Sequence, residues 1–212
     1  MKFQGIVLAG GKSSRFGEDK ALALVDGMPM IQRTVNLLTE LQLDPCVITN
    51  ASRDYSFLTC RIERDLVPDK GPMGGLYTAG CLFEDCSLVV LTCDMPALTS
   101  ASVRYLIERH KKDNGATVYS CKENFKHPFP GVYETSLRDS ISKFIEIKQM
   151  SMQELFKAIP EINVLGFPFD QGMLSNINEK RDLNYHPFLE NNFLHTKIKG
   201  KKIRNVKRGS RF

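Results

Sequence analysis

The stretch "IVLAGGKSSRFGEDKAL", residues 6–22, decides how this chain begins to fold. Its first four residues are apolar and predict a short buried strand, and a loop rich in glycine, lysine and arginine follows directly. A loop of this composition after a strand is either a tight structural turn or a site where backbone N–H groups and cations hold an anion, phosphate above all.

The size and composition of the chain indicate a globular protein. It has 212 residues, of which 42% are hydrophobic and 25% charged, and it can bury a sizeable core without disulfides or metals. No apolar run approaches the roughly 20 residues of a membrane span, and the short apolar run near the start is unlike a signal peptide. We therefore expect no membrane association.

The six cysteines contain no C-x-x-C pair and lie mostly in apolar segments. This pattern is typical of small buried thiols in a reducing compartment, so disulfides and a zinc site are not expected. The cysteines therefore predict a cytoplasmic protein.

The net charge of +5 comes from the end of the chain. Residues 197–212 hold eight lysines and arginines and no acidic residue, so residues 1–196 carry 21 cations against 24 anions, a net charge of −3. Such a tail is either solvated and flexible or in contact with an acidic partner, a nucleic acid or a neighbouring subunit. We predict a domain at 1–190 and a flexible basic extension at 191–212, and nucleic-acid binding is not the expected function of the domain.

Apolar strand patterns alternate with helical periodicity along residues 1–190. Strands are predicted at 5–9, 45–52, 60–65, 87–94, 116–121, 129–134 and 162–167. Helices are predicted around 31–41, at 76–82 after a loop at 66–75, at 100–113 with a serine N-cap, twice within 136–159, and from near Glu179. This order predicts an α/β fold of the Rossmann-like type, a three-layer αβα arrangement in which helices cover both faces of a mostly parallel sheet.

Four polar elements lie at the carboxyl ends of predicted strands. They are the glycine loop, Asn50, Asp65 and Asp94. Ligands of open α/β sheets bind beyond the carboxyl ends of the strands. We therefore expect these elements to meet in one crevice.

The glycine loop matches neither of two common phosphate-binding motifs. A Walker A loop, G-x-x-x-x-G-K-[ST], needs a glycine where Ile6 stands, although Gly11, Lys12 and Ser13 fit its end. The dinucleotide motif G-x-G-x-x-G fails because Gly10 and Gly11 are adjacent. What remains is L-A-G-G-x-x-x-R-x-G-x-D-K, whose arginine and lysine can meet an anion held over the two glycines.

This pattern resembles the signature of the nucleotidyltransferases that begin with L-A-G-G-x-S-x-R-x-G-x-D-K, most of all that of the molybdenum cofactor guanylyltransferases. Further matching segments are "LVDGMPMIQR", "GPMGGL", "LTCDMPAL", "HPFPGVY" and "SNINEKRDL", so the resemblance covers residues 3–185. It implies the nucleotidyltransferase fold and an enzyme that transfers GMP from GTP to the terminal phosphate of molybdopterin with release of pyrophosphate.

The resemblance also implies roles for individual residues. Those expected to bind the nucleotide are Leu8, Ala9, Gly10, Gly11, Lys20, Asn50, Asp65 and Asp94. Arg15, Lys20 and Asp94 are the implied catalytic residues. The two cations would neutralise the triphosphate and the leaving pyrophosphate. Asp94 and Asn178, with Asn176 near it, would hold Mg²⁺ through oxygen atoms.

The implied reaction needs no general base, because the attacking phosphate oxygen is already ionised at neutral pH. Accordingly, His127 is expected to be a structural or substrate-side residue and is given no chemical role. One of Asn176 and Asn178 is expected to cap the helix near Glu179. Docking on a molybdopterin carrier or on target molybdoenzymes is compatible with the resemblance.

Three hypotheses stay open at this point. The first is a GTP:molybdopterin guanylyltransferase. The second is a relative that uses CTP or another phosphorylated acceptor, such as a sugar or polyol phosphate. The third is a non-catalytic nucleotide-binding or scaffold protein, which would not need a metal carboxylate at Asp94 beside the cations Arg15 and Lys20.

Overall fold

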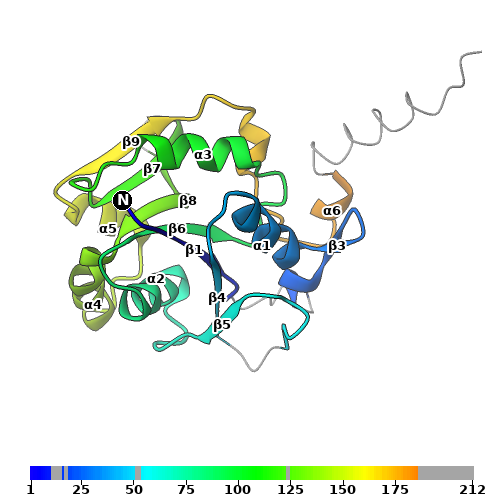
Figure 1. Cartoon of the computed structure of the whole chain (residues 1–212), viewed down its shortest axis with the longest axis horizontal. Coiled ribbons are helices and arrows are strands. Elements are labelled where there is room, and N and C mark those ends of the chain that lie inside the picture. Colours follow the sequence, from blue (N-terminus) through cyan, green and yellow to red (C-terminus); the bar gives the residue numbers. More distant parts are fainter. Residues whose placement is uncertain (11–15, 17–18, 51–53, 123–124, 186–212) are drawn as a thin grey trace, which may run out of the picture.

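The computed structural model describes residues 1–10, 16, 19–50, 54–122 and 125–185. Its elements follow one another along the chain in the order of the colours in Figure 1. They are β1 (Phe3–Leu8), η1 (Lys20–Leu22), β2 (Leu24–Val25), β3 (Met28–Pro29), α1 (Met30–Glu40), β4 (Pro45–Thr49), β5 (Arg61–Arg64), α2 (Gly71–Leu82), β6 (Ser87–Thr92), α3 (Ser100–Arg109), β7 (Ala116–Lys122), β8 (Phe125–Glu134), η2 (Thr135–Leu137), α4 (Arg138–Glu146), α5 (Met152–Ala158), β9 (Ile162–Gly166), η3 (Gln171–Leu174) and α6 (Asp182–Tyr185).

A seven-stranded sheet in the order β5-β4-β1-β6-β8-β7-β9 forms the centre of the molecule. β1 pairs in parallel with β4 and β6, β4 pairs in parallel with β5, and β7 with β9. β8 is antiparallel to both of its neighbours, β6 and β7. The predicted mostly parallel α/β sheet is therefore confirmed, with one reversed strand and a small separate ribbon of β2 and β3.

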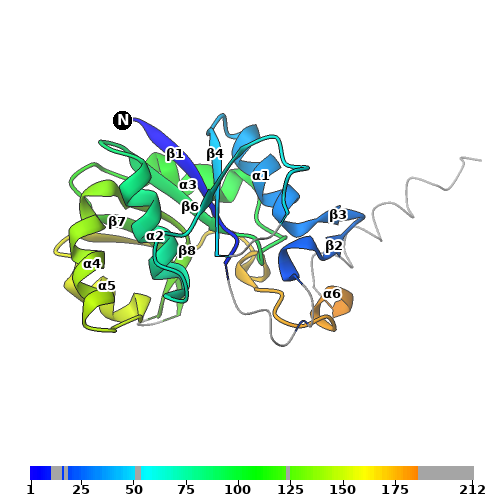
Figure 2. The ribbon, with the colours of Figure 1, turned by 90° about the horizontal axis from the view of Figure 1, so that it is seen from below.

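Helices cover both faces of this sheet, as the three-layer prediction requires (Figure 1, Figure 2). α2, α4 and α5 lie on one face, and α1 and α3 on the other. Successive residues of a strand point to opposite faces, so Ile6 of β1 packs in the core beneath α2 and Val7 in the core beneath α1. Because both faces are covered, the central strands are near-continuous apolar runs.

The apolar spacing of α1 matches its packing. Ile31, Val35 and Leu38 recur every three or four residues, and all three are buried against the sheet. The helix ends at Glu40, and the chain turns at Gln42 with a φ of 59° before it enters β4. A helix therefore forms where the sequence predicts it.

α2 begins earlier than predicted. The sequence predicts a loop at 66–75, but the helix starts at Gly71 with Pro72 in its first turn. Proline is favoured there because its missing N–H would have no helical partner anyway. The glycines of this turn oppose a helix by propensity, yet packing requires one of them: a Cβ on Gly74 would lie 2.7 Å from the carbonyl oxygen of Val67.

Two helix starts differ from prediction in their capping residues. α3 is capped by Thr99 and not by a serine, because Thr99 Oγ1 accepts the N–H of Ser102 while Ser102 Oγ accepts the N–H of Thr99. α6 begins at Asp182 and not near Glu179. The N–H groups of Asn178 and Glu179 donate to Asp182 Oδ2, each at 2.8 Å, so a carboxylate organises this segment in place of the predicted asparagine cap.

A buried polar cluster lies at the amino ends of β6 and β7. His110 contacts Thr117 Oγ1 through Nδ1 at 2.8 Å and Glu134 Oε1 through Nε2 at 2.7 Å. Ser87 also donates to Glu134 Oε1. All four residues are buried, and these bonds give their side chains the partners that burial requires.

The described cysteines and helices bear on two expectations from the composition, those about disulfides and about membrane spans. Cys46, Cys86 and Cys93 are buried free thiols, and Cys60 and Cys81 are half-buried and also free. In this part of the chain, no helix has the length and apolar character required to cross a bilayer.

Candidate functional site

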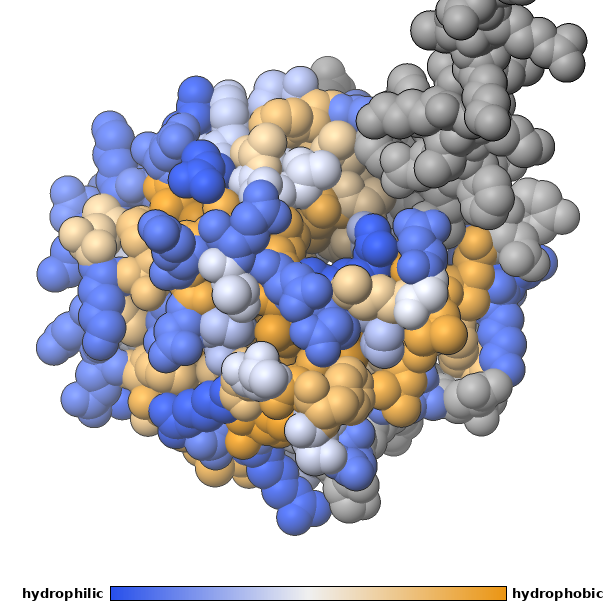
Figure 3. Space-filling view, turned by 45° about the vertical axis from the view of Figure 1, so that its right-hand side comes forward, coloured by the Kyte–Doolittle hydropathy of each residue, from blue (hydrophilic) through white to orange (hydrophobic). Residues whose placement is uncertain are grey.

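A cavity of about 690 Å³ opens at the carboxyl ends of β1, β4 and β6. Its walls include Ala9 and Gly10, where the glycine loop begins, together with Asn50, Asp65 and Asp94. The structure thus brings these separate polar elements into one crevice, in the place where α/β sheets bind ligands. Figure 3 shows a face that is hollowed near its middle, where hydrophilic and hydrophobic side chains adjoin.

Gly10 lies directly against the side chain of Asn50. A Cβ on Gly10 would be 2.5 Å from Asn50 Oδ1 and 3.0 Å from its Cγ, well inside van der Waals contact. The surrounding backbone is fixed, because the N–H of Ala9 donates to Ile48 O at 2.9 Å and Thr49 Oγ1 donates to Ala9 O at 3.4 Å. A side chain here would displace the Asn50 amide, whereas glycine leaves it in place and allows a ligand to approach the backbone closely.

Asp65 has a structural role as well as a place on the cavity wall. It is buried, and its Oδ1 accepts a hydrogen bond from Thr78 Oγ1 at 2.7 Å and another from the N–H of Val67 at 3.1 Å. These bonds join the end of β5 to α2. The nucleotide contact of Asp65 stays a prediction beside this role.

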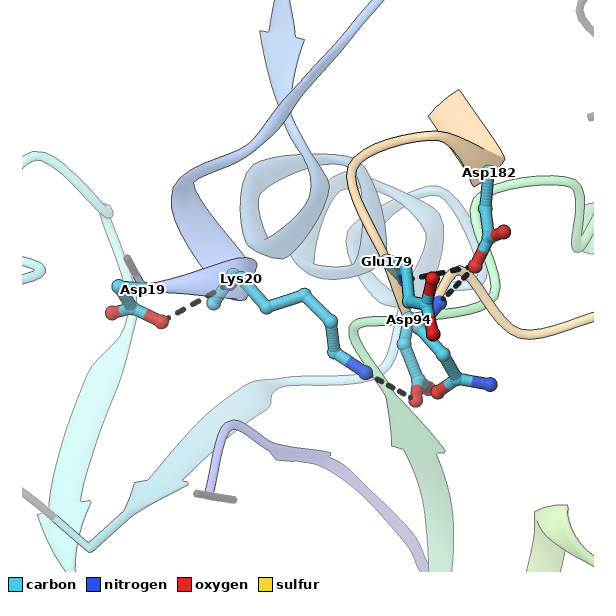
Figure 4. A network of polar contacts seen from close by, with 7 residues as sticks. Asp19, Lys20, Asp94, Glu179 and Asp182 are labelled. Atoms are coloured by element: carbon cyan, nitrogen blue, oxygen red, sulfur yellow. Dashed lines mark hydrogen bonds and ion pairs between the residues drawn. The ribbon is translucent and has the colours of Figure 1, made fainter. Parts of the chain in front are cut away.

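Lys20 and Asp94 form an ion pair inside the cavity (Figure 4). Lys20 Nζ lies 3.0 Å from Asp94 Oδ2, and the two side chains are 21% and 17% exposed. The other carboxylate oxygen, Asp94 Oδ1, is buried and has no hydrogen-bond partner among the described residues, and the same holds for Thr92 Oγ1. Buried polar atoms are normally paired, so these two oxygens at the end of β6 indicate a place for a ligand or a cation.

The donor atoms around Asp94 fit a hard divalent cation. The N–H of Ile177 donates to the main-chain oxygen of Asp94 at 2.8 Å, and the flanking Asn176 and Asn178 lie on the cavity wall. Within the described ranges, no three His, Cys, Asp or Glu side chains cluster as a metal site. Mg²⁺ does not require such a cluster, because one or two carboxylates, substrate phosphates and waters usually hold it. The unpartnered Asp94 Oδ1 is the atom that makes the site suitable.

Lys20 is positioned by its neighbour Asp19, a role that the sequence analysis missed. Asp19 Oδ1 accepts the N–H of Ala21 at 3.1 Å and so caps the η1 turn that carries Lys20. Asp19 Oδ2 accepts a hydrogen bond of 2.7 Å from the hydroxyl of Tyr55, which is almost fully buried. Figure 4 shows Lys20 extending from this turn to Asp94. Asp19 belongs to the glycine-loop motif and could have been found there, whereas no sequence signal connects Tyr55 to it.

The wall formed by β8 is aromatic. Phe125, His127, Pro128 and Phe129 of this strand line the cavity, and the pairing of β8 with β7 shifts register between His127 and Gly131. Phe129 is buried in the core, whereas Phe125 is 46% exposed. The rings of Phe125 and His127 meet edge to face, with centroids 4.9 Å apart. The predicted strand at 129–134 was too short, and a strand predicted from residue 125 would have grouped these rings.

Cys93 also lies on the cavity wall, as a neutral thiol. Burial raises its pKa to about 12, and the negative charge of Asp94 acts in the same direction. Because the thiolate is the nucleophilic form, Cys93 is no nucleophile at neutral pH. This agrees with chemistry based on positioning and charge.

The predicted site residues fall into two groups. Gly11 and Arg15 lie outside the described residues, so their places and roles stay predictions. The others all lie on the walls of this cavity: Leu8, Ala9, Gly10, Lys20, Asn50, Asp65, Asp94 and Asn178.

Comparison with known proteins agrees with the motifs and with the fold. The MobA-like NTP transferase domain family matches residues 5–162. A protein of Flavobacterium johnsoniae named probable molybdenum cofactor guanylyltransferase is 33% identical over 179 residues, which cover 84% of this chain and 93% of the relative. A protein of the same name from Thermococcus sibiricus is 31% identical over 187 residues, 84% of this chain and 94% of the relative. The crystal structure of molybdopterin-guanine dinucleotide biosynthesis protein A from Archaeoglobus fulgidus has the same fold, with a TM-score of 0.75 at 20% identity over 89% of this chain and 99% of that one.

Proposed function

The chain belongs to the MobA-like NTP transferase family, and from this premise we propose that it is a molybdenum cofactor guanylyltransferase. Such an enzyme transfers GMP from GTP to the terminal phosphate of molybdopterin and releases pyrophosphate. The observation that carries the proposal is the Asp94 carboxylate, with one oxygen paired to Lys20 and the other buried and unpartnered among the described residues.

In the proposed reaction, an oxygen of the acceptor's terminal phosphate attacks the α-phosphorus of GTP. A new P–O bond forms there, the bond from the α-phosphorus to the bridging oxygen breaks, and pyrophosphate leaves with that electron pair. The attacking oxygen is ionised at neutral pH, so no proton has to be removed. Catalysis then depends on positioning and on charge neutralisation.

The residues of the cavity suit catalysis by positioning and charge neutralisation. Lys20 carries a positive charge to the end of β6, where charge-assisted hydrogen bonds to phosphate oxygens would be strong. Gly10 permits close approach to the backbone, and the amide of Asn50 beside it can bind polar groups of the nucleotide. Arg15 is proposed as the second cation.

Nucleotidyltransferases of this kind typically use a divalent metal, and we propose Mg²⁺ for this one. Asp94 and Asn178 would hold it, since both line the cavity and Asp94 Oδ1 has no other partner among the residues described. When bound, the ion would neutralise charge on the phosphates.

Pyrophosphate release tests the proposal. The purified protein is incubated with Mg²⁺ and each of ATP, CTP, GTP and UTP, with and without molybdopterin. We expect release with GTP and molybdopterin together, and a rate at least about 100-fold lower in Asp94→Asn, which keeps the side-chain shape but loses the charge. Asp85→Asn is the matched control, because Asp85 is exposed in the loop before β6, at the opposite end of the strand.

Other outcomes would favour the other hypotheses. Preference for CTP would make the protein a cytidylyltransferase, and release with a sugar or polyol phosphate would change the acceptor. Nucleotide binding without release under any of these combinations would contradict the proposed reaction and favour either a different acceptor or a non-catalytic scaffold. Docking on a molybdopterin carrier or molybdoenzyme, a cytoplasmic location, and the division into 1–190 and 191–212 stay predictions.

A further inference from the structure

The proposed function requires two ligands in one cavity, with their reacting phosphates between them. The strand order gives the cavity two ends. Asn50 and Asp65 follow β4 and β5 on one side of β6, whereas β8 lies next to β6 on the other side. Asp94 lies two residues beyond the end of β6 and therefore between the two ends.

The two ends differ in chemistry. Among the described residues, the carboxylates and the ammonium group on the cavity walls are those of Asp19, Lys20, Asp65 and Asp94. β8 contributes rings instead, those of Phe125, His127, Pro128 and Phe129. A polar end and an aromatic end suit two different substrates.

We propose that Phe125 and His127 form the acceptor end of the cavity, where Phe125 stacks on a planar heteroaromatic ring of the acceptor. This inference rests on the proposed function, because it assigns the acceptor of that reaction to one wall. Phe125 is 46% exposed at the cavity wall, whereas Phe129 of the same strand is buried in the core and anchors the strand there.

The exposure of Phe125 at the cavity wall leaves ring surface for stacking. Phe125 and His127 meet at an interplanar angle of 87°, so the contact between them is edge to face and not a stack that would occupy a face of both rings. The contact also restricts how far either ring can turn, which lowers the entropy lost on binding.

The position of the charges assigns this wall to the acceptor and not to the base of GTP. Lys20 Nζ and Asp94 meet at the end of β6, so phosphate groups belong there. The proposed roles of Gly10 and Asn50 in nucleotide binding would place the nucleoside on the side of β1 and β4. A ring on the β8 side of the phosphates therefore belongs to the second substrate.

Binding measurements with Phe125 variants test the inference. The dissociation constant of molybdopterin is measured by calorimetry, with Mg²⁺ and a non-hydrolysable GTP analogue present, and that of GTP is measured separately. For Phe125→Ala we expect molybdopterin to bind roughly 5- to 100-fold more weakly, the range found when a stacked aromatic side chain is removed, with GTP binding unchanged. Phe125→Tyr keeps the ring and should bind as the wild type does. Phe125→Leu keeps apolar surface without a ring and should resemble Phe125→Ala.

Ile147→Ala is the control. Ile147 is an apolar residue that is 71% exposed and does not line the cavity, so this variant should bind both ligands normally. Phe125 and Ile147 are both exposed to solvent, so their removal leaves the core intact.

Several results would overturn the inference: unchanged molybdopterin binding in Phe125→Ala, an equal loss of GTP binding, full affinity in Phe125→Leu, or no molybdopterin binding by the wild type. Binding is measured without turnover, so a failure of this inference can be distinguished from a failure of the proposed reaction. A protein that binds molybdopterin through Phe125 but releases no pyrophosphate would support this subsite and contradict the proposed reaction.

Discussion

Replacement of Gly10 by alanine tests whether the junction of β1 and the glycine loop is a nucleotide site. The added Cβ would lie 2.5 Å from Asn50 Oδ1, whereas ordinary contact begins at 3.4 Å, so one group must move by the difference, about 0.9 Å. Asn50 directly follows β4, whose Ile48 and Thr49 are hydrogen-bonded to Ala9, so the backbone is held and the clash is relieved by displacement of the Asn50 amide. Overpacking of this kind costs about 1–3 kcal/mol.

The Gly10→Ala variant is expected to lose activity more than stability. A misplacement near 1 Å at a positioning group can lower the rate about 100-fold, and we expect this loss in kcat/KM for GTP. In a chain of this size, 1–3 kcal/mol corresponds to a fall of roughly 2–12 °C in melting temperature. Pyrophosphate release at varied GTP and saturating molybdopterin gives the first quantity, and circular dichroism on heating gives the second.

Two further variants separate the clash from the mere presence of a methyl group. Gly166→Ala adds a Cβ that meets nothing within 4 Å, so both quantities should equal those of the wild type. In Gly10→Ala/Asn50→Ala the amide is gone, so the activity should be no lower than in Asn50→Ala alone. A Gly10→Ala enzyme with normal kcat/KM for GTP, or a double variant whose losses simply add, would refute the reasoning.

Three other perturbations each test one local feature of the structure. Tyr55→Phe removes the hydroxyl that donates to Asp19. In steady-state assays this variant should lower kcat about tenfold without changing KM for molybdopterin. An unchanged kcat would argue against positioning of Lys20 through this bond. Thr99→Ala should lower the free energy of unfolding by about 1 kcal/mol in urea titrations with normal kinetics, because α3 loses its cap away from the cavity. Burial raises the pKa of Cys46 from 9.0 to about 12. Above pH 9 the folded state therefore keeps a proton that the unfolded state loses. The free energy of unfolding then falls as the pH rises, by up to about 1.4 kcal/mol per pH unit. Urea titrations from pH 8 to 10.5 should show a shallower fall in Cys46→Ala, and an equal slope would contradict this cause.

The sheet could be predicted because its central strands are buried on both faces. The run "SLVVLT" of β6 is almost uniformly buried, and such a run is visible without tertiary information. The first turn of α2 was missed, since the glycines of "GPMGG" oppose a helix by propensity and only the close packing of Gly74 explains them. The reversal of β8 depends on its pairing with β6 and β7, which no pattern within the strand encodes.

The candidate site could be predicted in part for a related reason. Asn50, Asp65 and Asp94 each follow a strand, and parallel strands end at one edge of the sheet, so their convergence follows from the order of elements alone. The contact between Asp19 and Tyr55 joins two loop segments 36 residues apart and has no periodic signature. Side chains that position a catalytic group through such a contact become visible only in three dimensions.

The two ends of β6 differ in whether their buried polar groups have hydrogen-bond partners. At the amino end, Ser87 donates to Glu134, which also contacts His110, so the carboxylate has two partners. At the carboxyl end, Thr92 Oγ1 and Asp94 Oδ1 are buried without a partner among the described residues. An unsatisfied buried group costs about 1–3 kcal/mol, a large share of the roughly 5–15 kcal/mol by which a domain is stable. This destabilisation is tolerable at the carboxyl end of β6, because bound phosphates and a cation would satisfy both oxygens there.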